Sequence, residues 1–157
     1  MSTYCGAVGG RALFVAVLLV SVALSQTAFA TLGGDAPSLQ ADRAHLKASS
    51  LTVAHMLYSV EEMQTPSGTQ IRQYVSPEGV VFAVSWQGAA PDLQQLLGPY
   101  FEQYVTGADA QHARRRGGVH IDDGDLVIDT AGHMRFVVGR AYLRSKVPQG
   151  MASDEIR

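Results

Sequence analysis

Apolar and polar side chains alternate along residues 80–87, as they do in a β-strand. The large side chains share one face at every second position, and they belong to Val80, Phe82, Val84 and Trp86. The other face is also mostly apolar as far as Ala83. A strand with two apolar faces is typical of the middle of a sheet, so we predict a central strand here.

Directly after this strand the apolar residues change to helical spacing. Pro91 and Asp92 predict the start of a helix, because proline suits the first turn and a carboxylate suits the positive end. Gly98-Pro99 interrupts it, because proline removes a backbone hydrogen bond. We predict a kink, or two short helices with Pro99 opening the second, and in both cases one apolar stripe on the sheet. The stripe consists of Leu93, Leu96, Leu97, Tyr100, Phe101 and Tyr104.

Two further runs precede the central strand. Residues 51–64 favour a strand through their β-branched and aromatic side chains, and residues 70–75 alternate in the same way. Turn-forming residues separate the runs at Thr65–Gly68 and at Ser76–Gly79. Three strands joined by short turns predict an antiparallel meander. Ahead of the meander we expect a short helix at residues 38–47.

Polar residues place that short helix. Ser38 or Asp35 would cap its first turn through a side-chain oxygen. Leu39 and Leu46 lie near helical spacing and would cover a sheet edge, whereas Asp42 would point outward.

The chain after the aromatic helix is less regular. Residues 106–118 show no periodic apolar face and include the run Arg114–Arg116, so we expect a surface loop. After this loop, the sequence leaves open whether Val119–Ile121 forms a short strand.

A second hairpin is predicted near the C-terminal end. Residues 125–130 and 133–143 would form it, with the turn at Ala131-Gly132. Met134, Phe136 and Val138 share one face of the second strand, and Arg140 and Arg144 continue the same parity. Either a bulge near Gly139 therefore resets the register, or the strand runs out past the core. Residues beyond Pro148 are expected to be disordered.

Residues 1–30 have the pattern of a secretory signal peptide. Arg11 supplies the positive charge, Ala12–Leu24 form a small and apolar segment, and Ala28–Ala30 is a small-x-small cleavage site. The apolar segment is shorter than the roughly 20 residues that a spanning helix needs. We therefore expect cleavage after Ala30, export to the periplasm or beyond, and no membrane span after cleavage. An uncleaved N-terminal anchor is the alternative.

Composition narrows the classes of partner. Cys5 is the only cysteine and lies in the leader, so the mature chain would rely on its core and not on disulfides. Arg11 is the only charged residue of the leader, so the net charge of −2 becomes about −3 after cleavage. A slightly acidic chain is a poor match for nucleic acid or an anionic membrane surface.

Together these patterns predict a single α+β domain at residues 31–147, between the leader at 1–30 and a tail at 148–157. We expect an antiparallel sheet of about five strands in the order βββαββ, with one main kinked helix packed across it and a short N-terminal helix.

Three groups of short motifs are distinctive. They are LGGD at Leu32–Asp35, FAVSW with PDLQQLLG and YFEQY within residues 82–104, and GHMRFVVGRAYL at Gly132–Leu143. As a set they resemble the bacterial domain of unknown function 2844 family, over about Leu32 to Val147. The resemblance implies an exported bacterial protein without an assigned activity. It offers no catalytic or binding residues, and the run Arg114–Arg116 has no counterpart in it.

Acidic residues and a histidine are concentrated at residues 120–129. Their spacing lacks the alternate ligand positions and distant glutamate of a calcium-binding loop, and Gly124 after two aspartates is ordinary turn chemistry. The mature chain also has no zinc-type histidine spacing, no cysteine and no G-x-S-x-G elbow. We therefore expect no metal, no cofactor and no catalytic residue. The runner-up function, a periplasmic hydrolase or metal-assisted enzyme, would use His120, Asp122 and Asp123.

Trp86, Tyr100 and Tyr104 are the candidate binding residues. Aromatic side chains combine an apolar body with a polar tip, so these three could line a groove, although filling the core is the simpler interpretation. The leading hypothesis is a non-catalytic accessory or binding module of the bacterial envelope. Its partner would be an envelope protein or a glycan, held in the helix–sheet groove or at an exposed sheet edge.

Overall fold

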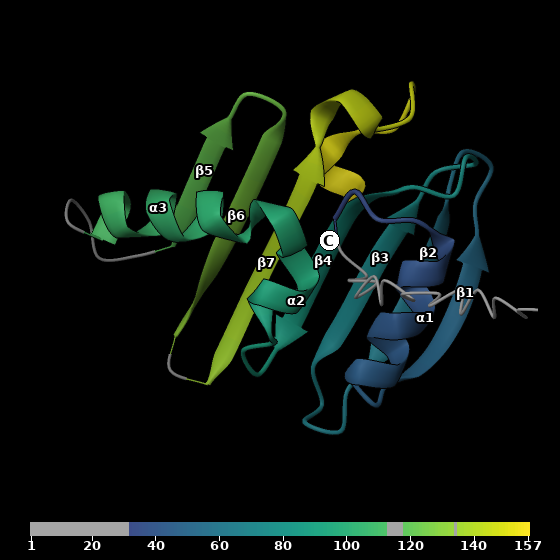
Figure 1. Cartoon of the computed structure of the whole chain (residues 1–157), viewed down its shortest axis with the longest axis horizontal. Coiled ribbons are helices and arrows are strands. Elements are labelled where there is room, and N and C mark those ends of the chain that lie inside the picture. The colour runs from purple at the N-terminus through teal and green to yellow at the C-terminus, as the bar shows by residue number, and fades with distance from the viewer. Residues whose placement is uncertain (1–31, 113–117, 134) are drawn as a thin grey trace, which may run out of the picture.

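The computed structural model describes residues 32–112, 118–133 and 135–157. Seven strands form one antiparallel sheet in the order β1-β2-β3-β4-β7-β6-β5 within these residues (Figure 1). The fold class is therefore α+β with an antiparallel sheet, as predicted. The elements in chain order are α1 (Ala36–His45), β1 (Ser49–Ala54), β2 (Ser59–Gln64), β3 (Gln70–Val75), β4 (Val81–Gly88), α2 (Leu93–Leu97), η1 (Gly98–Tyr100), α3 (Phe101–His112), β5 (Val119–Asp123), β6 (Leu126–His133), β7 (Phe136–Leu143), η2 (Arg144–Lys146) and η3 (Ser153–Glu155).

The expected number of about five strands is too low, for two reasons. Residues 51–64 are not one strand, because the chain turns at Met56-Leu57 and forms the β1–β2 hairpin. The amide of His55 donates to the carbonyl of Tyr58 at 2.8 Å and closes this turn. The short strand that was left open exists as β5 and forms the other edge of the sheet. The predicted antiparallel meander is confirmed and gains one strand, β1.

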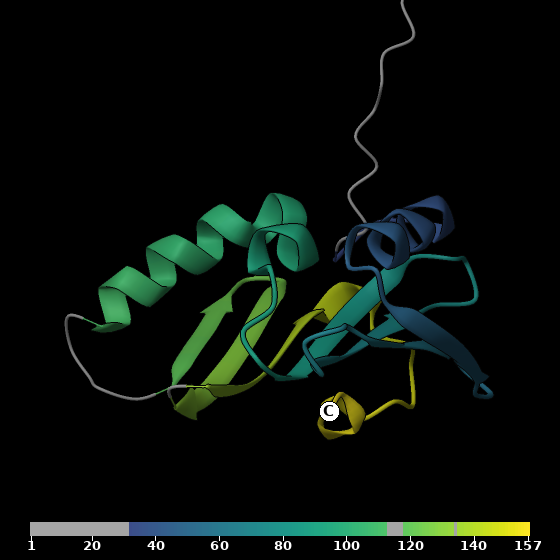
Figure 2. The same cartoon turned by 90° about the horizontal axis from the view of Figure 1, so that it is seen from below.

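The helices α1, α2 and α3 all cover one face of the sheet, which we call the helix face (Figure 2). The opposite face is called the open face. On the helix face Trp86 is 2% exposed and shares one core cluster with Leu96 and Leu97 of α2. Tyr100 and Phe101 pack against this cluster from the side. The central strand and the aromatic helix thus fold onto each other as predicted.

The aromatic helix is broken where its sequence predicts. Gly98 has a φ of 49°, and the chain passes through the short turn η1 before α3 begins. The prediction of a loop from Thr106 is wrong, because α3 continues to His112 and buries Ala108 against the core. Gly107 lets α3 approach β5 closely, which no periodic apolar pattern reveals. The run Arg114–Arg116 lies outside the described residues. None of the described helices is long and apolar enough to cross a membrane.

A β-bulge interrupts β4 at Phe82. Tyr74 pairs with Ala83 and Val75 pairs with Val81, so Phe82 has no direct partner on β3. The bulge turns Phe82 to the open face, where its ring lies 6.2 Å from that of Tyr74. The prediction that Phe82 shares a face with Val84 is therefore wrong, because one extra residue reverses the direction of every side chain beyond it.

The β6–β7 hairpin turns later than predicted, because β6 continues to His133 and β7 begins at Phe136. Neither ladder of β7 shifts its register at Gly139, so the bulge proposed there does not exist. This glycine has another role. Trp86 lies directly opposite on β4, and its indole covers Gly139 so closely that a Cβ would collide with it.

The segment 148–157, expected to be disordered, is packed on the open face. Met151 and Ile156 are buried there in a cluster with Phe82 and Tyr142. Tyr74 Oη donates to the carbonyl of Arg157 at 2.9 Å. The prediction failed because two well-separated apolar residues in a polar segment produce no periodic signal, although both find a hydrophobic site.

The short helix α1 is confirmed, with Asp35 as its cap accepting from the amide of Ser38 at 3.3 Å. Asp42, however, does not point outward, because its side chain is 0% exposed. Gln95 Nε2 donates to its Oδ1 at 2.8 Å, and Gln73 Nε2 donates to its Oδ2. Burial raises the pKa of Asp42 to about 6, and the two amide hydrogen bonds oppose this only in part.

Candidate functional site

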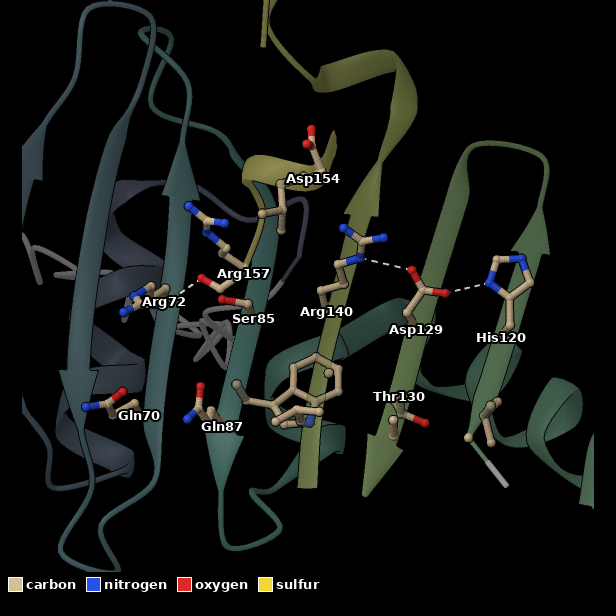
Figure 3. Close-up of a pocket in the computed structure, with 17 residues that line it drawn as sticks. Gln70, Arg72, Ser85, Gln87, His120, Asp129, Thr130, Arg140, Asp154 and Arg157 are labelled. Carbon is tan, nitrogen blue, oxygen red and sulfur yellow. Dashed lines mark hydrogen bonds and ion pairs between the residues drawn. The ribbon is translucent and has the colours of Figure 1, made fainter. Parts of the chain in front are cut away.

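The open face of the sheet contains a cavity of about 650 Å³ (Figure 3). Five strands, β3 to β7, contribute side chains to it, and the segment 154–157 forms one wall. Its volume falls within the range of about 300–1,000 Å³ that is usual for ligand pockets. The cavity exists because side chains alternate between the two faces of a strand, and the helices cover only the other face.

One row of charged side chains crosses this cavity from strand to strand. Arg72 Nε donates to Glu62 Oε1 at 2.8 Å, and Arg140 Nε donates to Asp129 Oδ2 at 2.9 Å. Each arginine therefore has a carboxylate on its outer side. The register partners along the row are Glu62, Arg72, Ser85, Arg140, Asp129 and His120.

The two arginines also hold the C-terminal segment in place. Arg72 Nη1 donates to the carbonyl of Arg157 at 2.6 Å, and Arg140 Nη1 donates to the carbonyl of Ser153 at 2.8 Å. Ile156, between these two attachment points, is fully buried. The arginine row therefore serves as a clamp for the segment that forms the wall of the cavity.

A second row, next to the charged one, forms the floor of the cavity. Gln70 pairs with Gln87, Gln87 pairs with Val138, and Val138 pairs with Ala131. All four side chains are exposed. The floor thus offers two amide groups at one end, each with a donor and an acceptor, and an apolar surface at the other.

At the far rim, His120 Nδ1 lies 2.5 Å from Asp129 Oδ1. Burial acts to raise the pKa of Asp129, but hydrogen bonds from His120 and Arg140 outweigh it and hold the pKa below its usual value. Figure 3 shows the three side chains in one line across β5, β6 and β7. A carboxylate that orients an exposed histidine is an arrangement able to support proton transfer.

The other acidic residues of the 120–129 stretch are engaged elsewhere. Arg144 donates to both oxygens of Asp122, at 2.7 and 2.6 Å, and this ion pair lowers the pKa of Asp122. Asp125 accepts from the amide and the hydroxyl of Ser145, at 2.6 and 2.8 Å. Gly124 has a φ of 62° in the intervening turn. Within the described residues no group of three or more acidic, cysteine or histidine side chains could hold a metal ion.

The residues proposed for an aromatic groove lie mainly on the helix face. Trp86 contributes to the lining of the cavity but is almost fully buried, whereas Tyr100 and Tyr104 pack against the hydrophobic core and do not line this cavity. Of the enzyme candidates His120 lines the cavity, while Asp122 and Asp123 do not. The partner of His120 is Asp129, and the intervening Asp122 belongs to a different ion pair.

Sequence reasoning missed the arginine clamp and the glutamine floor. Arg72 and Gln70 share a parity on β3, and Arg140 shares a parity with Val138 on β7, which the sequence does show. What it does not show is that β7 inserts next to β4, because that pairing joins residues about 55 positions apart in the chain.

Comparison with known proteins gives one match. No curated protein and no solved structure matches the chain. A family model described as "Protein of unknown function (DUF2844)" matches residues 28–156. This match spans the sheet, the helices and the clamped C-terminal segment, and the chain therefore belongs to the DUF2844 family of proteins of unknown function.

Proposed function

We propose that the protein is an exported, non-catalytic binding module of the bacterial envelope, and that its cavity holds a short peptide segment of an envelope partner. The observation that carries this proposal is the floor of the cavity, where two exposed amide side chains stand beside an exposed apolar surface. A peptide needs both, because its backbone requires donors and acceptors while its side chains require apolar contact.

A peptide suits this floor better than a glycan does. Sugar rings are commonly held by stacking on exposed aromatic side chains. Apart from the His120 imidazole, Trp86 is the only aromatic side chain among the described residues that line the cavity, and it is buried on the helix face beneath α2. Val138 and Ala131, whose side chains are exposed, provide aliphatic contacts instead.

Export is supported by the leader pattern of residues 1–30 and by the start of the core. Leu32 is fully buried, and its amide donates to the carbonyl of Leu96 at 3.1 Å. Gly33 and Gly34 bond to the backbone of Val81 at 2.7 and 2.9 Å. Residues 32–34, directly after the proposed cleavage site, are therefore held in the fold by their own contacts.

The binding proposal is tested with the mature chain and a displayed library of random short peptides. Ala131→Phe fills the floor, and Ala110→Phe places the same side chain on an exposed position of α3 as a control. We expect selected peptides to bind the wild type and Ala110→Phe alike and to lose at least about tenfold in affinity for Ala131→Phe. Failure to select any peptide, or equal binding by both variants, contradicts the proposal, and selective binding on a glycan array favours the other ligand class.

A second function deserves a direct test because His120 meets Asp129 at 2.5 Å at the cavity rim. In this candidate His120 acts as the general base of a hydrolase and Asp129 orients it. Activated esters such as nitrophenyl acetate are the substrates to try. Turnover that disappears in His120→Ala and persists in the control His45→Ala supports the hydrolase, and equal rates in the two variants exclude it.

A further inference from the structure

The two edges of the sheet differ in whether their outer backbone groups are hydrogen-bonded. At the β5 edge, Gln111 of α3 bonds to both backbone groups of His120: its Oε1 accepts from the amide at 2.9 Å, and its Nε2 donates to the carbonyl. At the β1 edge no described residue pairs with the outer backbone groups. An uncovered edge is a template for another strand.

β1 also lacks the features that usually keep edge strands apart. Its sequence SSLTVA contains no charged residue, no proline and no glycine, and its pairing with β2 has no register shift. Leu51 is 63% exposed and Val53 is 36% exposed, on the same side of the strand. Natural edge strands typically carry a lysine, a proline or a bulge against such pairing.

The pairing pattern identifies which backbone groups face outward. The amide of His55 points inward to Tyr58, and antiparallel ladders alternate between inward and outward groups. The backbone amides and carbonyls of Ser49, Leu51 and Val53 therefore point towards β2. The outward amides and carbonyls belong to the alternate residues Ser50, Thr52 and Ala54.

These outward groups are self-complementary in one register. If two β1 strands meet antiparallel around a two-fold axis at Thr52, then Thr52 faces Thr52 and Ser50 faces Ala54 of the second copy. Each of these pairs exchanges two hydrogen bonds. In the same register Leu51 lies opposite Val53 of the second copy, twice, so that the exposed apolar side chains cover each other. No charged side chain of β1 faces another.

We propose that two copies of the chain associate through β1 in this register, which joins their sheets into one continuous sheet. β1 is fixed in an extended conformation beside β2, because Thr52 Oγ1 donates to Glu61 Oε2 at 2.5 Å and Arg43 also donates to Glu61. A second copy is the occupant that fits, since β1 itself supplies the matching apolar pairs and the matching hydrogen bonds. The association is independent of the ligand proposed for the cavity.

The first test is the molar mass of the mature chain in solution, measured by light scattering and by sedimentation over a range of concentrations. We expect a concentration-dependent dimer, because a single pair of edge strands buries little surface. Leu51→Lys should raise the dimer dissociation constant at least about tenfold, whereas Val105→Lys, which adds the same charge on α3, should change it less than about twofold. A wild type that stays monomeric at about 100 μM, or equal effects of both lysines, overturns the proposal.

The second test examines the register. The mature chain has no cysteine, so Leu51→Cys and Val53→Cys each introduce a single thiol. We expect a mixture of the two variants to form a disulfide-linked dimer under oxidised glutathione faster than either variant alone, because only the mixture places the two thiols directly opposite. If each variant links with itself as quickly as with the other, the proposed register is wrong. Unchanged melting temperatures of all variants ensure that the folded protein is being compared.

Discussion

Two carboxylates on opposite faces of the same sheet have pKa values that are shifted in opposite directions. Asp42 of α1, which is buried between the helices and the sheet, has a pKa raised to about 6, because its burial is offset only in part, mainly by hydrogen bonds from Gln95 and Gln73. Asp129, on the open face, has a lowered pKa, because hydrogen bonds from His120 and Arg140 outweigh its partial burial. The depth of burial decides the direction of the shift, because desolvation dominates at the fully buried Asp42, whereas the hydrogen bonds outweigh it at the partly exposed Asp129.

This difference separates a structural face from a candidate binding face. The helix face is filled by Trp86, the leucines of α2 and the amides around Asp42, and it leaves its charge poorly compensated. The open face pairs Arg72 with Glu62 and Arg140 with Asp129, and it leaves room beside these pairs. Changes on the helix face should therefore have large effects on stability, while changes on the open face should have small effects on stability and act mainly on binding.

The largest effect is expected for Trp86→Ala. The indole is 2% exposed and fills the space above Gly139, so its removal should lower the free energy of unfolding by about 3–5 kcal/mol. Urea denaturation followed by circular dichroism measures this. Phe136→Ala on the open face, where the ring is 47% exposed, is the control and should change stability by well under about 1 kcal/mol. Equal losses would mean that the two faces do not differ in the way described.

The next effect is the pH dependence that Asp42 imposes. Because its pKa is higher in the folded state than the ordinary 3.8, its contribution to stability is fully present below about pH 4 and is lost as pH rises through about 6. The loss amounts to about 3 kcal/mol between these limits. Asp42→Asn should remove this dependence and leave the variant more stable than the wild type at pH 7. Unfolding curves at pH 4, 5, 6 and 7 measure it, and parallel curves for both proteins contradict it.

Trp86 and Asp42 also show what the sequence could and could not predict. The fold class, the central strand, the helix break at Gly98 and the core role of Trp86 follow from local periodicity and from proline chemistry. Asp42 did not, because a polar residue on a short helix gives no sign of the amides that β3 and α2 bring to it. The bulge at Phe82 was missed for a similar reason, since one extra residue is visible only in the pairing of two strands.

The cavity could not be predicted for the same reason, because the sequence does not show which strands pair. Its residues lie on alternate positions of five strands, and their parity can be read from the sequence once each strand is known. The strand order cannot be read from the sequence, because β7 pairs with β4 although the helices and the β5–β6 hairpin separate these two strands in the chain. The clamped segment was missed as well, because Ile156 finds its site only when Arg72 and Arg140 stand side by side across β4.

A smaller loss is expected for Gly139→Ala. A Cβ at this position would collide with the indole of Trp86, so the tryptophan must leave its place or the strands must separate. We expect the free energy of unfolding to fall by about 1–3 kcal/mol, as for other overpacked cores. The double variant Trp86→Ala with Gly139→Ala should lose less than the sum of the two single losses, because the collision then disappears. Urea denaturation of the four proteins gives the coupling, and strict additivity would show that Gly139 matters for another reason.

The smallest effect is expected at Asp129, and it has the opposite sign to that of Asp42. Because the folded-state pKa of Asp129 is lowered, its contribution to stability is present above its ordinary pKa and is lost as pH falls through the folded value. Its side chain is 34% exposed, so solvent screens the pairs and the contribution should stay below about 1 kcal/mol. Asp129→Asn should therefore lower stability slightly at pH 7, and the difference from the wild type should shrink as falling pH protonates the wild-type carboxylate. Melting temperatures of both proteins between pH 7 and acidic pH measure the difference, and a loss that does not shrink as pH falls would show that Asp129 acts through packing and not through its charge.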